Sequence, residues 1–138
     1  MKKKFLAFVI AIGLLNTMAA ATVTRASDYL SSYGGALGAE GNGVMTLSYS
    51  VYGTRVMDVV GAKEIKVEQK VGTNWYSYAT YSVDDYPEFY NYDKVSKSAD
   101  FSFAGVPGVT YRVILTAYAE LNGGSDTGTV TISEETCT

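Results

Sequence analysis

The chain has 138 residues, a length that suits one compact domain. It contains 11 basic and 14 acidic residues, no histidine and a single cysteine, Cys137. The acidic balance disfavours nucleic acid and anionic lipid as partners. The lack of histidine excludes the usual Ser-His-Asp and Cys-His catalytic groups and zinc sites built on imidazole, and one cysteine allows no internal disulfide.

The first 21 residues have the pattern of a secretory signal peptide. Three lysines at positions 2–4 precede an apolar run at 5–15, which is too short to span a membrane. Ala19 and Ala21 then fit the small-residue requirement of signal peptidase. We therefore expect a secreted, extracellular protein.

The mature chain is expected to be residues 22–138, with a cut after Ala26 as the alternative. Cleavage removes three lysines, so the mature chain is more acidic than the full one. No second hydrophobic segment follows, and we expect no membrane span in the mature chain. Cys137, one residue from the end, is expected on a short flexible C-terminal tail as an inert or adventitiously oxidised thiol, and the alternative is a disulfide with another chain.

Apolar and polar residues alternate along much of this mature chain, which is typical of strands with one buried face. Turn sequences such as Glu40-Gly41-Asn42-Gly43 and Leu121-Asn122-Gly123-Gly124 separate the alternating runs. The strands are expected at 33–39, 45–51, 65–70, 75–83, 98–103, 109–120 and 129–133.

These seven or so strands, without a convincing helical period, predict an all-β fold. The spacing favours a single antiparallel β-sandwich of the immunoglobulin or fibronectin III type. Two longer connections are expected, at 52–62 and 84–95.

Three acidic residues, Asp84, Asp85 and Glu88, crowd the second of these connections. A glycosidase needs two carboxyl groups at a defined separation, and calcium prefers oxygen ligands. A chain of this size offers no obvious deep cleft, and Asp84-Asp85 lacks the spaced order of a known calcium loop. The sequence therefore predicts no enzyme, no catalytic residue, no metal site and no cofactor, while calcium binding by this loop stays open.

Tyrosine is abundant, with 12 copies, and several gather between positions 75 and 92. A tyrosine ring is rigid and apolar with a polar tip, which suits recognition of proteins and stacking on sugars. The candidate ligand-binding residues are Tyr76, Tyr78, Tyr86, Tyr90 and Tyr92.

Alternation divides the aromatic residues of the strand at 75–83 between its two faces. Trp75 and Tyr81 share one face and are expected in the core, whereas Tyr76 and Tyr78 share the other. The alternative for Tyr76 and Tyr78 is a cross-strand ladder that only stabilises the sheet.

The segment 105–118, Gly-Val-Pro-Gly-Val-Thr-Tyr-Arg-Val-Ile-Leu-Thr-Ala-Tyr, resembles the penultimate strand of fibronectin type III domains. The resemblance implies that Tyr111 is the corner tyrosine, whose hydroxyl bonds nearby backbone while its ring packs in the core. It also implies a tryptophan on the second strand, but the region 45–51 carries Tyr49 instead, and Trp75 lies on a later strand.

A second resemblance spans most of the mature chain. Ser31-Ser32-Tyr33, Asn74-Trp75, Tyr111-Arg112 and Gly123-Gly124-Ser125-Asp126 look like a family of small secreted proteins of Gram-positive anaerobes, domain of unknown function 6147. The resemblance implies an exported bacterial protein and brings no known activity or ligand.

Together these patterns predict a non-catalytic binding, adhesion or matrix module whose partner is a protein or glycan at a cell surface. One alternative is a structural protein that self-associates through sheet edges, which needs long, uncharged edge strands. The other is a glycan-directed hydrolase, which needs a cleft that holds two acids. The oligomeric state is left open.

Overall fold

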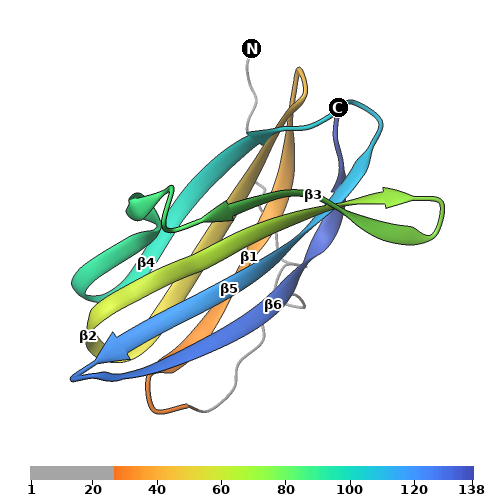
Figure 1. Ribbon diagram of the computed structural model, residues 1–138. Coiled ribbons are helices and arrows are strands. Elements are labelled where there is room, and N and C mark those ends of the chain that lie inside the picture. Colours follow the sequence, from red (N-terminus) through yellow and green to blue (C-terminus); the bar gives the residue numbers. More distant parts are fainter. Residues whose placement is uncertain (1–26) are drawn as a thin grey trace.

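The computed structural model describes residues 27–138, which fold into a six-stranded antiparallel sheet with one short 3-10 helix (Figure 1). The predicted all-β sandwich is confirmed. The predicted signal peptide and both candidate cleavage sites lie outside the described residues. In chain order the elements are β1 (Leu30–Gly41), β2 (Val44–Val71), β3 (Asn74–Ser82), η3 (Pro87–Phe89), β4 (Tyr90–Ala104), β5 (Thr110–Leu121) and β6 (Gly124–Thr136).

The long strand β2 organises the sheet because its two halves belong to different layers. Its first half pairs with β1 and with the second half of β4, and its second half pairs with β5 and β3. Between them β2 bends, where its register with β4 slips between Tyr52 and Met57, and the sheet curls into a half-barrel (Figure 1). Strand β6 completes the second layer beside β5.

The structure has six strands where the sequence predicted about seven, because the runs at 45–51 and 65–70 belong to one strand. The residues 52–62, expected as a connection, therefore belong to a strand. The sequence did not predict this strand, because the bend interrupts the alternation of buried and exposed side chains. Met57, Val60 and Ala62 are all buried there, at spacings that no single alternation gives. The connection after β3 is also shorter than expected, since β4 begins at Tyr90.

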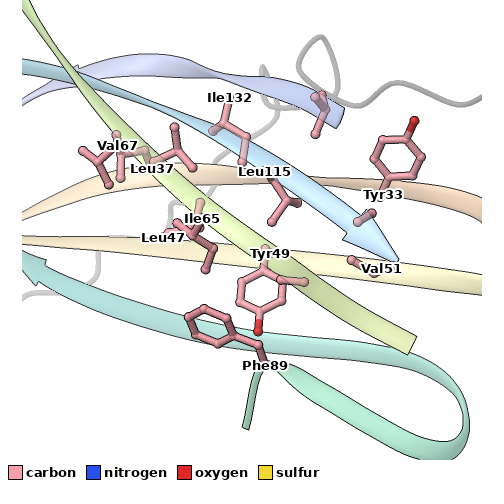
Figure 2. Packing of buried hydrophobic residues seen from close by; sticks show 14 of the residues in the cluster. Tyr33, Leu37, Leu47, Tyr49, Val51, Ile65, Val67, Phe89, Leu115 and Ile132 are labelled. Atoms are coloured by element: carbon pink, nitrogen blue, oxygen red, sulfur yellow. The ribbon is translucent and has the colours of Figure 1, made fainter. Parts of the chain in front are cut away.

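The core lies between the two layers and is aliphatic at its centre. Figure 2 shows Leu37 of β1, Leu47 and Ile65 of β2, Leu115 of β5 and Ile132 of β6 pointing into this space. Each of these side chains is at most 8% exposed. No charged residue of the part described is buried, so burial of these side chains is opposed by little charge desolvation.

Tyr111 has the contact that the fibronectin resemblance predicted. Its ring is fully buried, and the backbone N–H of Val106 donates to its Oη at 2.8 Å. The hydroxyl thus satisfies a backbone donor of the preceding loop, which fixes that loop to β5.

The C-terminal residues are packed rather than forming the expected flexible tail. Cys137 is 1% exposed, its N–H donates to the Val109 carbonyl at 2.9 Å, and its carbonyl accepts from Gly108 at 2.8 Å. The Thr138 carbonyl also accepts from Gly43. Backbone pairing and burial of the thiol therefore hold this end against the sheet, which the position of Cys137 in the sequence did not reveal.

A buried phenol makes the core sensitive to alkali. Burial, together with the nearby Glu88 carboxylate, raises the pKa of Tyr49 to about 12. The unfolded chain releases the Tyr49 proton near pH 10, whereas the folded chain keeps it until about pH 12. The contribution of the neutral phenol to stability is therefore fully present below pH 10 and is lost as the pH rises to 12. Between these pH values, the free energy of unfolding of the wild type should fall more steeply than that of Tyr49→Phe, by up to about 1.4 kcal/mol per pH unit.

Urea unfolding at pH 8 and pH 11 measures this difference. Tyr76→Phe, at an exposed position on β3, is the control and should follow the wild type. If the wild type and Tyr49→Phe lost the same free energy of unfolding between pH 8 and pH 11, Tyr49 would not be the group responsible.

Candidate functional site

An aromatic cluster of Tyr81, Tyr86, Phe89, Phe101 and Phe103 fills the space between β3, η3 and β4. Tyr86 stacks on Phe89 with 5.3 Å between ring centroids, and Phe101 meets Phe89 at 5.2 Å and Tyr81 at 4.8 Å. Phe89 is only 2% exposed. Tyr86, a predicted ligand-binding residue, is thus a packing member of the aromatic cluster, and the same holds for the expected core residue Tyr81.

A β-bulge turns Tyr78 inward, against the prediction that it shares an outer face with Tyr76. The β2–β3 register slips between Val67 and Glu68, which leaves Tyr78 without a partner on β2. Its ring lies 4.8 Å from that of Tyr111, and its hydroxyl donates to the Ala104 carbonyl at 2.8 Å. Tyr78 therefore ties β3 to the end of β4.

The same bulge places Trp75 on the outer face instead of in the core. Its half-buried ring lies 4.3 Å from the guanidinium carbon of Arg112, and the Arg112 Nε donates to Glu68 at 2.7 Å. Tyr76, by contrast, is 52% exposed and lies apart from the other candidate tyrosines.

Two of the predicted residues do come together, with a third tyrosine that the prediction omitted. Tyr90 stacks on Tyr118 at 5.5 Å with an interplanar angle of 24°, and Tyr92 meets Tyr90 edge-on at 6.4 Å. Tyr92 is 59% exposed. We call Tyr90, Tyr92 and Tyr118 the tyrosine platform.

Three adjacent strands position the tyrosine platform. Gly61 of β2 pairs with Tyr90 of β4 on one side and with Tyr118 of β5 on the other. Val60 and Ala119, next in line on their strands, are fully buried, so alternation directs the platform away from the core. The rings therefore rest on the outer face at the bend of β2.

Gly61 is required where it stands because the strands approach closely. A Cβ at this position would collide with the Phe89 carbonyl oxygen and lie 2.9 Å from the Tyr90 Cα. Without a side chain between them, the rings of Tyr90 and Tyr118 can reach each other across β2.

Charged groups border the tyrosine platform. The Tyr118 hydroxyl donates to Glu120 Oε1 at 2.6 Å, and this hydrogen bond, more than burial, raises the pKa of Tyr118. The Lys63 ammonium lies 5.8 Å from the centroid of the Tyr118 ring. Burial, with Tyr118 and Tyr92 beside it, raises the pKa of Tyr90 to about 12. The hydroxyls of Tyr90 and Tyr118 therefore stay neutral hydrogen-bonding groups at physiological pH.

Three acidic residues are exposed to solvent: Asp84 and Asp85 in the turn before η3, and Glu88 within η3. The backbone N–H groups of Asp85 and Tyr86 donate to the Ser82 carbonyl, which shapes the turn. Within residues 27–138, no group of three or more histidine, cysteine, aspartate or glutamate side chains has the geometry to hold a metal ion. This part of the chain also contains no helix of the length and hydrophobicity needed to cross a membrane.

Two shallow hollows lie away from the tyrosine platform. The first, of about 580 Å³, lies over β1, β2 and β4 and is lined by serines, glycines, alanines, tyrosines and one acid, Asp100, which accepts from Ser48 at 2.7 Å. The second, of about 420 Å³, includes Asp28 and Arg55. Each of these two hollows is lined by a single carboxylate.

Comparison with known proteins adds no relative. No protein-family model matches the chain, and neither the curated proteins nor the solved structures gave a match. The resemblances to fibronectin type III domains and to the family of unknown function 6147 therefore stay predictions.

The sequence contained a signal for the missing member of the platform. Alternation along β5 puts Tyr118 on the face opposite Val113 and Leu115, whose side chains are buried. What the sequence did not show is that the bend of β2 brings β4 and β5 to either side of Gly61.

Proposed function

We propose that this protein is an exported bacterial module that binds carbohydrate at a cell surface, without catalysis, through the tyrosine platform. The observation that carries the proposal is the group of three contacting rings on an outer face, in which Tyr90 and Tyr118 are stacked and partly buried and Tyr92 is 59% exposed. Aromatic residues usually pack inside, so an exposed group with hydrogen-bonding neighbours favours recognition.

A sugar ring fits the chemistry of the tyrosine platform. The apolar face of a sugar stacks on an aromatic ring, and its hydroxyls need donors and acceptors at the edge. Tyr92 offers the exposed ring, while Glu120 and Lys63 lie beside Tyr118 as an acceptor and a donor. The strands hold these groups in place, so little conformational entropy is lost on binding.

We further propose that the sandwich is of the fibronectin III type and that the chain belongs to the family of unknown function 6147. The contact between Tyr111 and Val106 supports the first proposal. The expected signal peptide supports export.

Tyr92→Ala should weaken binding to a carbohydrate ligand at least about tenfold, because a ring that carries an interface typically contributes more than about 1.4 kcal/mol. A screen of glycans and cell-wall preparations with residues 22–138, followed by titration of the strongest ligand, measures the change. The free energy of unfolding should stay within about 0.5 kcal/mol of the wild type, since Tyr92 is mostly exposed.

Tyr76→Ala is the matched control, because it also removes a half-exposed tyrosine but from β3, and it should bind as the wild type does. Equal loss in both variants would remove the tyrosine platform as the site. If the wild type bound no carbohydrate but bound a surface protein, the proposed ligand class would be wrong.

A further inference from the structure

The edge of β3 differs from the other edges of the sheet. β3 pairs with β2 alone, so one side of its backbone is free of strand partners. Its nine residues, Asn74–Ser82, contain no charged residue and no proline. A free, uncharged edge presents unpaired N–H and C=O groups and recruits a further strand, and natural proteins usually guard such edges with charge.

The remaining edges of the described chain are guarded or covered. The free side of β4 carries Lys94, Lys97 and Asp100 along its length. The edges of β1 and β6 face each other, and the ring of Tyr33 packs over Gly128 of β6. β3 is therefore the edge that lacks both protections.

We propose that two copies of this chain associate through antiparallel pairing of their β3 edges. Because β3 carries no charge, the pairing opposes no like charges along the strand in any register, even though the protein as a whole is acidic. The contact uses the same surface on both copies, so it closes as a symmetric dimer and does not propagate into fibres. Exposed Tyr76 and Thr80 supply an aromatic ring and a hydroxyl for cross-strand contacts.

The bulge at Tyr78 sets the strength of this association. It interrupts the edge between Ser77 and Ala79, so regular pairing extends over a few residues on either side. Such a contact buries less than the ~1,200 Å² of a stable interface, and we expect a dissociation constant between about 0.1 and 1 mM. This inference is independent of the carbohydrate site, which lies on β4 and β5.

Sedimentation velocity of residues 22–138, the form that contains the entire described core, tests the proposal between about 10 µM and 1 mM. We expect the wild type to sediment faster as the concentration rises. Ser77→Lys should weaken self-association at least tenfold, because it places a charge on the edge, and its partner Glu68 on β2 accommodates the lysine within the monomer.

Thr129→Lys adds the same charge at an exposed position of β6 and should dimerise as the wild type does. Tyr92→Ala should also dimerise normally, which separates this result from the carbohydrate proposal. A wild type that stays monomeric up to 1 mM would overturn the inference. So would a dimer that persists in Ser77→Lys, or one that Thr129→Lys abolishes equally.

Discussion

Replacing Phe89 by alanine is expected to lower the free energy of unfolding by about 3–5 kcal/mol, the largest effect of any single side chain we consider. The ring is 2% exposed and contacts Tyr86, Phe101 and Tyr49 at centroid distances of 5.3, 5.2 and 6.4 Å. Its removal leaves a cavity in the aromatic cluster. The cavity cannot close easily, because β3 and β4 hold its walls apart. Urea unfolding followed by tryptophan fluorescence measures the loss.

Phe89→Leu is the conservative control, because it keeps most of the buried volume and should cost clearly less than the alanine variant. Tyr76→Ala should change stability by no more than about 0.5 kcal/mol. A loss below about 1 kcal/mol for Phe89→Ala would show that the aromatic cluster does not close this side of the half-barrel.

Gly61→Ala is expected to destabilise the protein by about 3 kcal/mol or to prevent folding, although it adds one methyl group. That methyl would collide with the Phe89 carbonyl oxygen, which belongs to backbone and not to a flexible side chain. To relieve the collision, β4 must move away from β2 at Tyr90, and the tyrosine platform opens. We expect a lower midpoint of urea unfolding and weaker carbohydrate binding in any folded fraction.

Gly38→Ala provides the matched control for Gly61→Ala. A Cβ at Gly38 comes no closer than 4.0 Å to the Thr46 carbonyl oxygen, and the methyl group restricts the unfolded chain. We expect Gly38→Ala to be neutral or to stabilise by about 0.4–1 kcal/mol. If both variants lost the same stability, the close approach at Gly61 would not be the cause.

The sequence predicted the fold well where one face of a strand is buried along its entire length. In β5 the residues Tyr111, Val113, Leu115 and Ala117 are fully buried, and the residues between them are only partly buried. The turn at Leu121–Gly124 likewise connects β5 to β6 as expected. Alternation and turn chemistry are local properties, so one chain segment suffices to predict them.

Two irregularities limited the prediction. The bend of β2 shifts the register at Tyr52 and again near Ala62, so a continuous strand read as two strands with a connection. The bulge at Tyr78 exchanged the faces of β3, so Trp75 lies outside and Tyr78 inside. Such shifts depend on the partner strand, and a single sequence does not specify which residue is left unpaired.

The candidate site was predicted in part. Tyr90 and Tyr92 lie together as the sequence proposed, yet Tyr86, four residues before Tyr90, packs into the aromatic cluster. The difference arises at η3, where the turn at Pro87–Phe89 directs Tyr86 and Phe89 inward before β4 begins. Tyr118 of β5 joins Tyr90 and Tyr92 because β4 and β5 both pair with β2 at Gly61. The sequence alone does not show this proximity, because the two strands are far apart along the chain.

In the proposed division of roles, the tyrosine platform binds the carbohydrate, whereas the aromatic cluster only stabilises the fold. The most direct test is the dissociation constant of the strongest carbohydrate ligand for Tyr92→Ala and for Tyr86→Ala, measured by titration calorimetry at a temperature where both variants are folded. We expect binding to be at least about tenfold weaker in Tyr92→Ala and unchanged in Tyr86→Ala. Unchanged binding in Tyr92→Ala, with binding lost in folded Tyr86→Ala, would show that the aromatic cluster and not the tyrosine platform holds the ligand.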